Sequence, residues 1–169
     1  RQMCIRDRLV SPMPTYLILT GFVLGGVVRG IIVGFLVLFT SLIFTDITVQ
    51  NVPLTLFVVV MTAFLFSIAG FLNALFADNF DDINIVPTFI LTPLIYLGGV
   101  FYSVELLSNT WQIVSKANPL LYMVNAFRYG MIGVSDINVQ FALLMIIIFI
   151  IAFFLLAYYL LKKGYGIRS

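Results

Sequence analysis

The stretch "VQFALLMIIIFIIAFFLLAYYLL", residues 139–161, contains no charged side chain. A transmembrane helix needs about 20 consecutive, predominantly apolar residues, so this stretch is long enough to cross a bilayer. The rest of the chain has a similar character, because 62% of its 169 residues are hydrophobic and only 9% are charged. A soluble domain carries about 25% charged residues. The sequence therefore predicts an all-α integral membrane protein.

Three further apolar runs precede this stretch. They cover roughly residues 16–44, 54–76 and 85–102. The breaks between the runs carry polar or acidic residues, as in "TDITVQNVP" (45–53), "ADNFDDIN" (77–84) and the long segment 103–138. We expect each run to form a transmembrane helix, which gives a bundle of four spans in a single transmembrane domain over residues 9–169.

The first eight residues, RQMCIRDR, differ in character from the rest of the chain. They hold three of the nine basic residues and one of the seven acidic ones. Without them, the chain has as many basic as acidic residues. We interpret residues 1–8 as a foreign segment and expect the natural protein to begin further upstream. The alternative is a genuine basic end on the cytoplasmic side.

Basic residues near the ends of spans indicate the orientation of the chain. The last run is followed by "KKGYGIRS" (162–169), and a cluster of Lys and Arg favours the cytoplasmic side. Four crossings then place both ends in the cytoplasm and segment 103–138 outside. Lys116 and Arg128 lie in that outer segment, against the rule.

Small residues recur within the spans. Gly26, Gly30 and Gly34 are spaced by four, a pattern that lets another helix approach closely. Packing inside the bundle and a subunit interface both fit, and we favour packing inside the bundle. The pair Gly98 and Gly99 is assigned to helix packing as well. In the third run, Pro93 should kink the helix, and the hydroxyls of Thr88 and Thr92 can satisfy the backbone groups that Pro93 frees.

Arg29 is a charged residue inside the first apolar run. A charge at bilayer depth costs about 2.5–3.5 kcal/mol on insertion scales, so it normally faces protein or water. Two interpretations remain open. In the favoured one, Arg29 lies near the cytoplasmic interface and snorkels to it, or forms a structural ion pair. In the other, it faces a substrate.

Segment 103–138 contains the polar stretch "NPLLYMVNAFRYGMIG" (118–133). Asn118 and Pro119 form a helix start, and Gly130 or Gly133 can end a helix of about 12 residues. One face of this helix is polar, with Arg128 at its flank, and comprises Tyr122, Asn125 and Tyr129. The opposite face is apolar and comprises Leu120, Met123, Val124, Phe127 and Met131.

The stretch "SNTWQIVSKANP" (108–119) predicts a second short helix directly before this one. The pair has two interpretations. It is either an inert interfacial hairpin or a lid whose polar side chains, Arg128 included, face a translocation path.

Three stretches together resemble a known family: "VPTFILTPLIYLGGVFYSVELL" (86–107), "NPLLYMVNAFRYGMIG" (118–133) and the terminal "KKGYGIRS". They are similar to the permease subunit of ABC-2 type exporters, and within that family to the YadH-type inner-membrane permeases. The resemblance covers about residues 9–169. It implies a six-span homodimeric permease of the bacterial inner membrane, served by two copies of a separate ATPase subunit. This chain would then lack the first two spans.

The resemblance also implies roles for particular residues. The short helices before the last span would be re-entrant and would close the outer side of the path. The residues of this exoplasmic gate would be Asn118, Pro119, Tyr122, Asn125, Arg128 and Tyr129. The ATPase would be contacted by Leu9 and Val10, in the remnant of a cytoplasmic connection. Asp81 and Asp82, in the other cytoplasmic loop, are a further candidate contact, although a solvated loop is favoured there.

The residue inventory restricts the remaining function classes. The chain has no His, a single Cys at position 4 and no phosphate-binding G-x-x-x-x-G-K-[ST] loop, so we expect no metal site, no cofactor and no enzyme activity. Its partners would be the ATPase, a second permease copy and the lipid bilayer, with no nucleic acid. An ion-coupled carrier is an alternative, but its acidic residues all fall at span ends. A membrane scaffold without transport activity is the other alternative.

Overall fold

The computed structural model describes residues 15–44, 49–77, 82–101 and 108–163. Within these ranges the regular structure is entirely helical. In chain order the helices are α2 (Thr15–Phe44), α3 (Val52–Phe76), α4 (Asp82–Ile85), the π-helix η1 (Val86–Leu91), α5 (Thr92–Leu97), α6 (Asn109–Lys116), α7 (Pro119–Ile132) and α8 (Val139–Lys162). The all-α prediction is confirmed.

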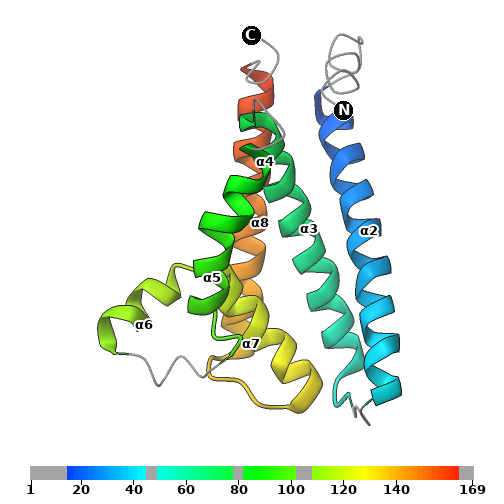
Figure 1. Ribbon diagram of the computed structural model, residues 1–169, viewed down its shortest axis with the longest axis vertical. Helices are drawn as coiled ribbons and strands as arrows, with labels where there is room; N and C mark the ends of the chain where they lie inside the picture. The colour runs from blue at the N-terminus through cyan, green and yellow to red at the C-terminus, as the bar shows by residue number, and fades with distance from the viewer. Residues whose placement is uncertain (1–14, 45–48, 78–81, 102–107, 164–169) are drawn as a thin grey trace.

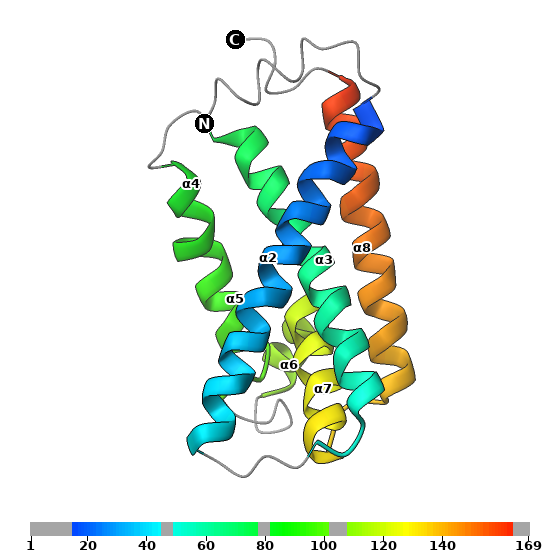
Figure 2. The same cartoon turned by 90° about the vertical axis from the view of Figure 1, so that its right-hand side faces the viewer.

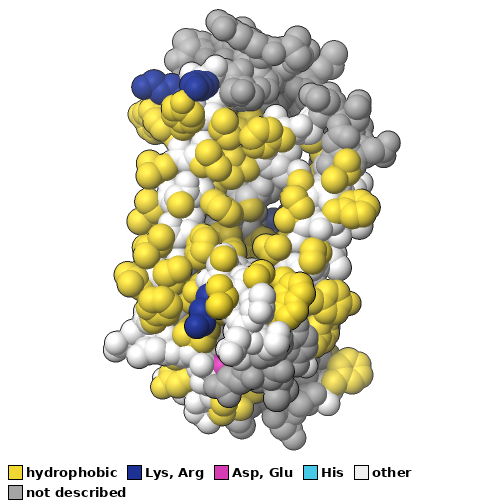
Figure 3. Space-filling view, turned by 90° about the vertical axis from the view of Figure 1, so that its left-hand side faces the viewer, with side chains coloured by type: hydrophobic (Ala, Val, Ile, Leu, Met, Phe, Trp, Pro, Cys, Tyr) yellow, Lys and Arg dark blue, Asp and Glu magenta, His cyan; other side chains and the backbone are white. Residues whose placement is uncertain are grey.

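Three helices are long and apolar enough to cross a membrane, namely α2, α3 and α8. They run side by side along the long axis of the molecule, with α6 and α7 at the end away from Lys162 (Figure 1). Few of their side chains are buried in the isolated chain, and Figure 3 shows apolar side chains covering one face along much of its length. Such all-round apolarity suits helices surrounded by lipid. The predicted runs 16–44, 54–76 and 139–161 match these three helices.

The third predicted run, 85–102, has a different form. Its apolar helix spans Ile83–Leu97 and is shorter than a membrane-length helix. The helix ends early because Gly98 caps it and Gly99 adopts a positive φ of 74°, a conformation that glycine reaches without a steric penalty. The predicted run therefore joins a helix to the turn after it.

Pro93 interrupts this shorter helix as the sequence indicates. The π-helical segment η1 ends at Leu91, directly before Thr92 and Pro93. Proline lacks an amide hydrogen and its ring crowds the preceding turn, so a locally widened helix accommodates it. The Thr92 hydroxyl donates a hydrogen bond to the Pro87 carbonyl at 3.2 Å, which is not the carbonyl that Pro93 leaves without a donor, so the expected role of a nearby hydroxyl stays a prediction.

The column formed by α4, η1 and α5 stands at the edge of the bundle. It lies apart from α2 in Figure 1 and apart from α8 in Figure 2. Its start is held by a hydrogen bond from Asn73 Nδ2 to the Ile83 carbonyl at 2.9 Å, and its end packs against α6 and α7. None of its residues from Ile83 to Leu97, whose side chains the structure describes, is fully buried. This column is therefore attached to the bundle mainly at its two ends.

The glycine series on α2 faces α3. A Cβ atom placed on Gly30 would lie 3.3 Å from the Ala63 Cβ, and one on Gly26 would lie 2.9 Å from the Ser67 Cβ. A Cβ on Gly34 would have more room, at 3.9 Å from the nearest Val59 atom. The close approach also lets the Ser67 hydroxyl donate to the Val23 carbonyl at 2.8 Å. These glycines thus lie at a helix contact within the chain.

Candidate functional site

Helix α7 begins and ends where the sequence predicts. The Asn118 side chain accepts a hydrogen bond from the Leu120 amide at 3.0 Å, and Pro119 occupies the first turn. Gly133 ends the helix in the left-handed conformation, with φ 80°, and its amide donates to the Tyr129 carbonyl at 2.8 Å. Asn118 also donates to the Leu94 carbonyl at 2.6 Å, so the same side chain ties α7 to α5.

The buried polar side chains of α7 are satisfied by neighbouring backbone. The Tyr122 hydroxyl donates to the Lys116 carbonyl at 2.6 Å, and its ring meets the Phe141 ring edge-on at 5.9 Å. Burial raises the pKa of Tyr122, so its hydroxyl stays protonated and remains a donor. Asn125, which is 1% exposed, donates to the Leu121 carbonyl and accepts from the Asp136 amide at 3.0 Å. These contacts fix α7 against α6, α8 and the loop before α8.

Arg128 joins three separate segments. One guanidinium nitrogen donates to the Gly99 carbonyl at 2.7 Å, in the turn after α5. The other lies 3.3 Å from an Asp136 carboxylate oxygen, in the loop before α8. Because Asn125 accepts from the Asp136 amide, the loop is held to α7 twice. We call Gly99, Arg128, Asp136 and Asn125 the Arg128 clasp.

Asp136 is not among the predicted gate residues, because the sequence shows only that it lies at a span end. A signal for its pairing nevertheless exists in the sequence. Arg128 and Asp136 are the only charged residues between positions 117 and 161, and they have opposite signs. In an apolar segment, each charge needs a partner, so two isolated charges of opposite sign indicate a candidate pair, and the structure decides that they meet.

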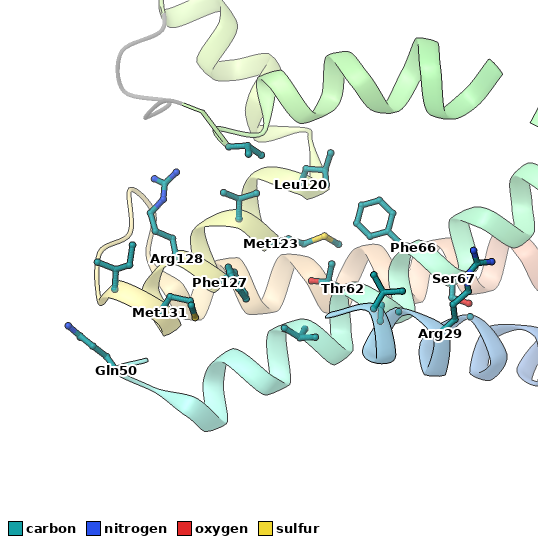
Figure 4. Close-up of a pocket in the computed structure, with 18 residues that line it drawn as sticks. Arg29, Gln50, Thr62, Phe66, Ser67, Leu120, Met123, Phe127, Arg128 and Met131 are labelled. Atoms are coloured by element: carbon teal, nitrogen blue, oxygen red, sulfur yellow. The ribbon is translucent and has the colours of Figure 1, made fainter. Parts of the chain in front are cut away.

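A cavity of about 1230 Å³ lies beside the clasp, between α2, α3 and α7. Arg29 and Ser67 are at one end of it, while Arg128 and Gln50 are at the other (Figure 4). Its apolar wall includes Val33, Val59, Phe66, Met123, Phe127 and Met131.

The face of α7 that meets this cavity is the apolar one. The apolar face lines it, through all five predicted members: Leu120, Met123, Val124, Phe127 and Met131. Of the four side chains expected to face a path, only Arg128 is part of the lining, whereas Tyr122 and Asn125 are buried against other segments. Tyr129 is partly buried and does not line the cavity either. The physical reason is that polar groups in an apolar environment turn toward protein partners.

Arg29 occupies the middle of α2 and lines the cavity. At 1.5 Å per residue, its Cα lies roughly 20 Å from each end of this helix, which is too far for the side chain to reach either end. No hydrogen bond or ion pair joins it to another residue in the described part of the chain. The interfacial position favoured from the sequence stays a prediction, and the ion pair that was its alternative is not found among the described residues.

Two other groups of predicted residues have simpler outcomes. Gly98 lies against α7, where an added Cβ would be 3.1 Å from the Leu120 Cβ, and Gly99 supplies a carbonyl to the Arg128 clasp. Leu9, Val10 and Asp81 lie outside the described residues, and Asp82 begins α4 without a described side chain. Over the described ranges, no three His, Cys, Asp or Glu side chains gather where a metal ion could bind.

The membrane-length helices define an all-α polytopic membrane protein, with a cavity between α2, α3 and α7. The model of the ABC-2 type transporter family matches residues 2–132. The inner membrane transport permease YadH of Escherichia coli K12, that of Escherichia coli O157:H7 and that of Shigella flexneri are each 48% identical over 168 residues. The chain belongs to the ABC-2 type transporter family, and the resemblance to its permeases is confirmed.

These alignments cover 99% of this chain and 66% of each relative. The chain thus spans about two thirds of the length of the curated relatives that it matches. Both comparisons extend into residues 1–8. No solved structure matches the chain.

Proposed function

We propose that the full-length protein is the permease subunit of an ABC exporter in the bacterial inner membrane. It would move a hydrophobic or amphipathic substrate outward, using ATP hydrolysed by a separate cytoplasmic subunit. Family membership supports a permease, and the relatives carry the name of inner membrane transport permeases. The observation that carries the proposal is the apolar cavity between α2, α3 and α7, bounded at one end by Arg128.

The Arg128 clasp supports a gate role for α7. It connects α7 to the turn after α5 and to the loop before α8, so a displacement of either segment would be transmitted to α7. Asn118 adds a second link to α5. In the proposed mechanism, these polar contacts hold α7 over the outer end of the cavity, and substrate passage requires the clasp to open.

The proposed assembly rests on the family resemblance. It contains two permease copies and two ATPase copies, with both ends of each permease in the cytoplasm. The candidate contacts with the ATPase remain Leu9, Val10, Asp81 and Asp82. The energy of transport would come from the ATPase, because this chain contains no phosphate-binding loop.

The proposal is tested by sequencing the genes beside that of the permease and co-expressing the full-length permease with any ABC ATPase found there. Inside-out vesicles are incubated with a cell extract, and their contents are compared by mass spectrometry after ATP or a non-hydrolysable analogue. We expect ATP-dependent accumulation that is lost when the P-loop lysine of the ATPase is replaced. Accumulation without ATP would indicate an ion-coupled carrier, and no accumulation or complex would favour a scaffold.

Arg128→Ala tests the gate in the same vesicles. We expect altered accumulation at an unchanged amount of permease in the membrane. Unchanged transport together with unchanged permease abundance would refute the gate role.

A further inference from the structure

The charges around the cavity are not balanced. Two basic side chains line it, Arg29 from α2 and Arg128 from α7, and none of its described lining residues is acidic. Arg128 is neutralised by Asp136 at 3.3 Å. Arg29 has no such partner among the residues that the structure describes. The lining therefore carries an uncompensated positive charge at the Arg29 end.

The wall of the cavity is mostly apolar and includes Val33 on α2. Phe66 on α3 and Met123 on α7 lie between Arg29 and Met131, which is at the Arg128 end (Figure 4). Methionine side chains are flexible and polarisable, so they adapt to hydrocarbon of varied shape. The face of the molecule in Figure 3 shows a hollow at mid-height, with basic atoms visible inside the apolar surface. A cation at one end of an apolar cavity is complementary to an amphiphile with an anionic head group.

We propose that this cavity binds a membrane-dissolved amphiphile whose carboxylate or phosphate head group contacts the Arg29 guanidinium. Its apolar chain would lie along the cavity face of α7. A guanidinium presents paired N–H donors that match both head groups. The cavity, at about 1230 Å³, has room for such a molecule. The inference concerns the cavity of the proposed function and rests on it only for the step from binding to export.

The position of Arg29 favours a ligand from the bilayer over an ion from water. It lies at the middle of a membrane-length helix. A small hydrated anion would lose its water shell to reach that depth and would gain no contact with the apolar wall. An amphiphile already has its chain in the bilayer, so it gains the guanidinium contact and also fills the cavity.

The test measures binding of cis-parinarate, a fluorescent fatty acid, to the full-length permease in nanodiscs of zwitterionic lipid, without the ATPase. Three variants are compared with the parent protein. Arg29→Gln removes the charge, Arg29→Lys keeps the charge but loses the paired donors, and Lys163→Gln removes one charge outside the cavity. We expect Arg29→Gln to weaken binding roughly 10- to 100-fold and Arg29→Lys to weaken it less. Lys163→Gln should stay within about twofold.

Competition on the parent protein identifies the ligand chemistry. Oleate should displace the probe, whereas methyl oleate, with the same chain and no charge, and inorganic phosphate should not. Equal displacement by oleate and methyl oleate would overturn the proposal, as would displacement by inorganic phosphate at the same concentration. Equal affinity of the parent protein and Arg29→Gln would also overturn it. These competition results remain decisive even if Arg29→Gln fails to fold.

Thermal unfolding without ligand separates the proposal from a structural role for Arg29. Removal of an uncompensated charge should not lower the melting temperature. A lower melting temperature with unchanged probe affinity would show that Arg29 pairs with protein, which overturns the proposal. Binding that depends on Arg29, combined with no ATP-dependent accumulation in vesicles, would refute the exporter function while leaving the binding site in place.

Discussion

The Arg128 clasp makes the most specific quantitative prediction. Arg128→Ala removes a charge-assisted hydrogen bond to the Gly99 carbonyl, which contributes about 1.5–3 kcal/mol in typical proteins. It also breaks the ion pair with Asp136. The two side chains are 24% and 16% exposed, so solvent screens the pair only in part, and we assign it about 1 kcal/mol. The expected loss in the free energy of unfolding is therefore about 2.5–4 kcal/mol.

A double-mutant cycle isolates the ion pair from the other contacts. Asp136→Asn should cost only about 1 kcal/mol, because the backbone amide of residue 136 still donates to Asn125. If the side chains interact, the double variant should be less destabilised than the sum of the single variants, by about 1 kcal/mol. Arg128→Lys is the matched control. It keeps the charge but cannot present the planar fork to two acceptors.

The assay is thermal unfolding of the full-length permease in detergent, followed by fluorescence. A loss of about 2.5–4 kcal/mol corresponds to a melting temperature lower by roughly 5–16 °C for a protein of about 150–250 residues. Arg128→Lys should fall between Arg128→Ala and the parent protein. An unchanged melting temperature for Arg128→Ala, or strictly additive losses in the cycle, would show that the clasp does not stabilise α7.

Three further substitutions test the packing and the caps. Gly26→Leu should destabilise the protein by about 1–3 kcal/mol, because its Cβ would lie 2.9 Å from the Ser67 Cβ. The control Gly25→Leu should cost little, because no atom lies within 4 Å of the added Cβ. Thermal unfolding of both variants checks this. Asn118→Ala should lower the free energy of unfolding by about 2–3 kcal/mol, because it removes both hydrogen bonds of this side chain. Asn118→Ser keeps an acceptor for the helix cap and should lose less. Equal losses for the two variants would contradict the capping role. Tyr122→Phe should cost about 1–2 kcal/mol and speed amide exchange in α6, and an unchanged exchange rate would show that its hydroxyl does not hold α6.

The limits of α7 depend on local chemistry, which is why the sequence predicts them well. The Asn118 side chain caps the first turn of the helix, and the Pro119 ring favours the helical φ there. Gly133 ends the helix by adopting the left-handed conformation. The three membrane-length helices are also predictable from local sequence, because the length of an apolar run determines whether a helix can span a bilayer. The π-helical segment before Pro93 also depends on local sequence, because the proline itself disturbs the helix there.

The composition of the cavity depends on contacts between segments far apart in the chain. A helical wheel divides α7 into two faces, but it does not say which neighbour each face meets. In a soluble protein the polar face would turn to water, whereas here Tyr122 and Asn125 turn inward to backbone partners. The wheel alone therefore assigns the polar face to the path and gives no sign that the apolar face lines the cavity.

The sequence by itself determined that this is an all-helical membrane protein of the ABC-2 type transporter family, with its long spans and the ends of α7. These properties depend on apolar length and on caps within a few residues. Only the tertiary structure decided that Arg128 pairs with Asp136 and that Arg29 lies beside the cavity without a described partner. The reason is that a charge within an apolar chain must find its partner in space, and the packing of α2, α3 and α7 sets which partners are within reach.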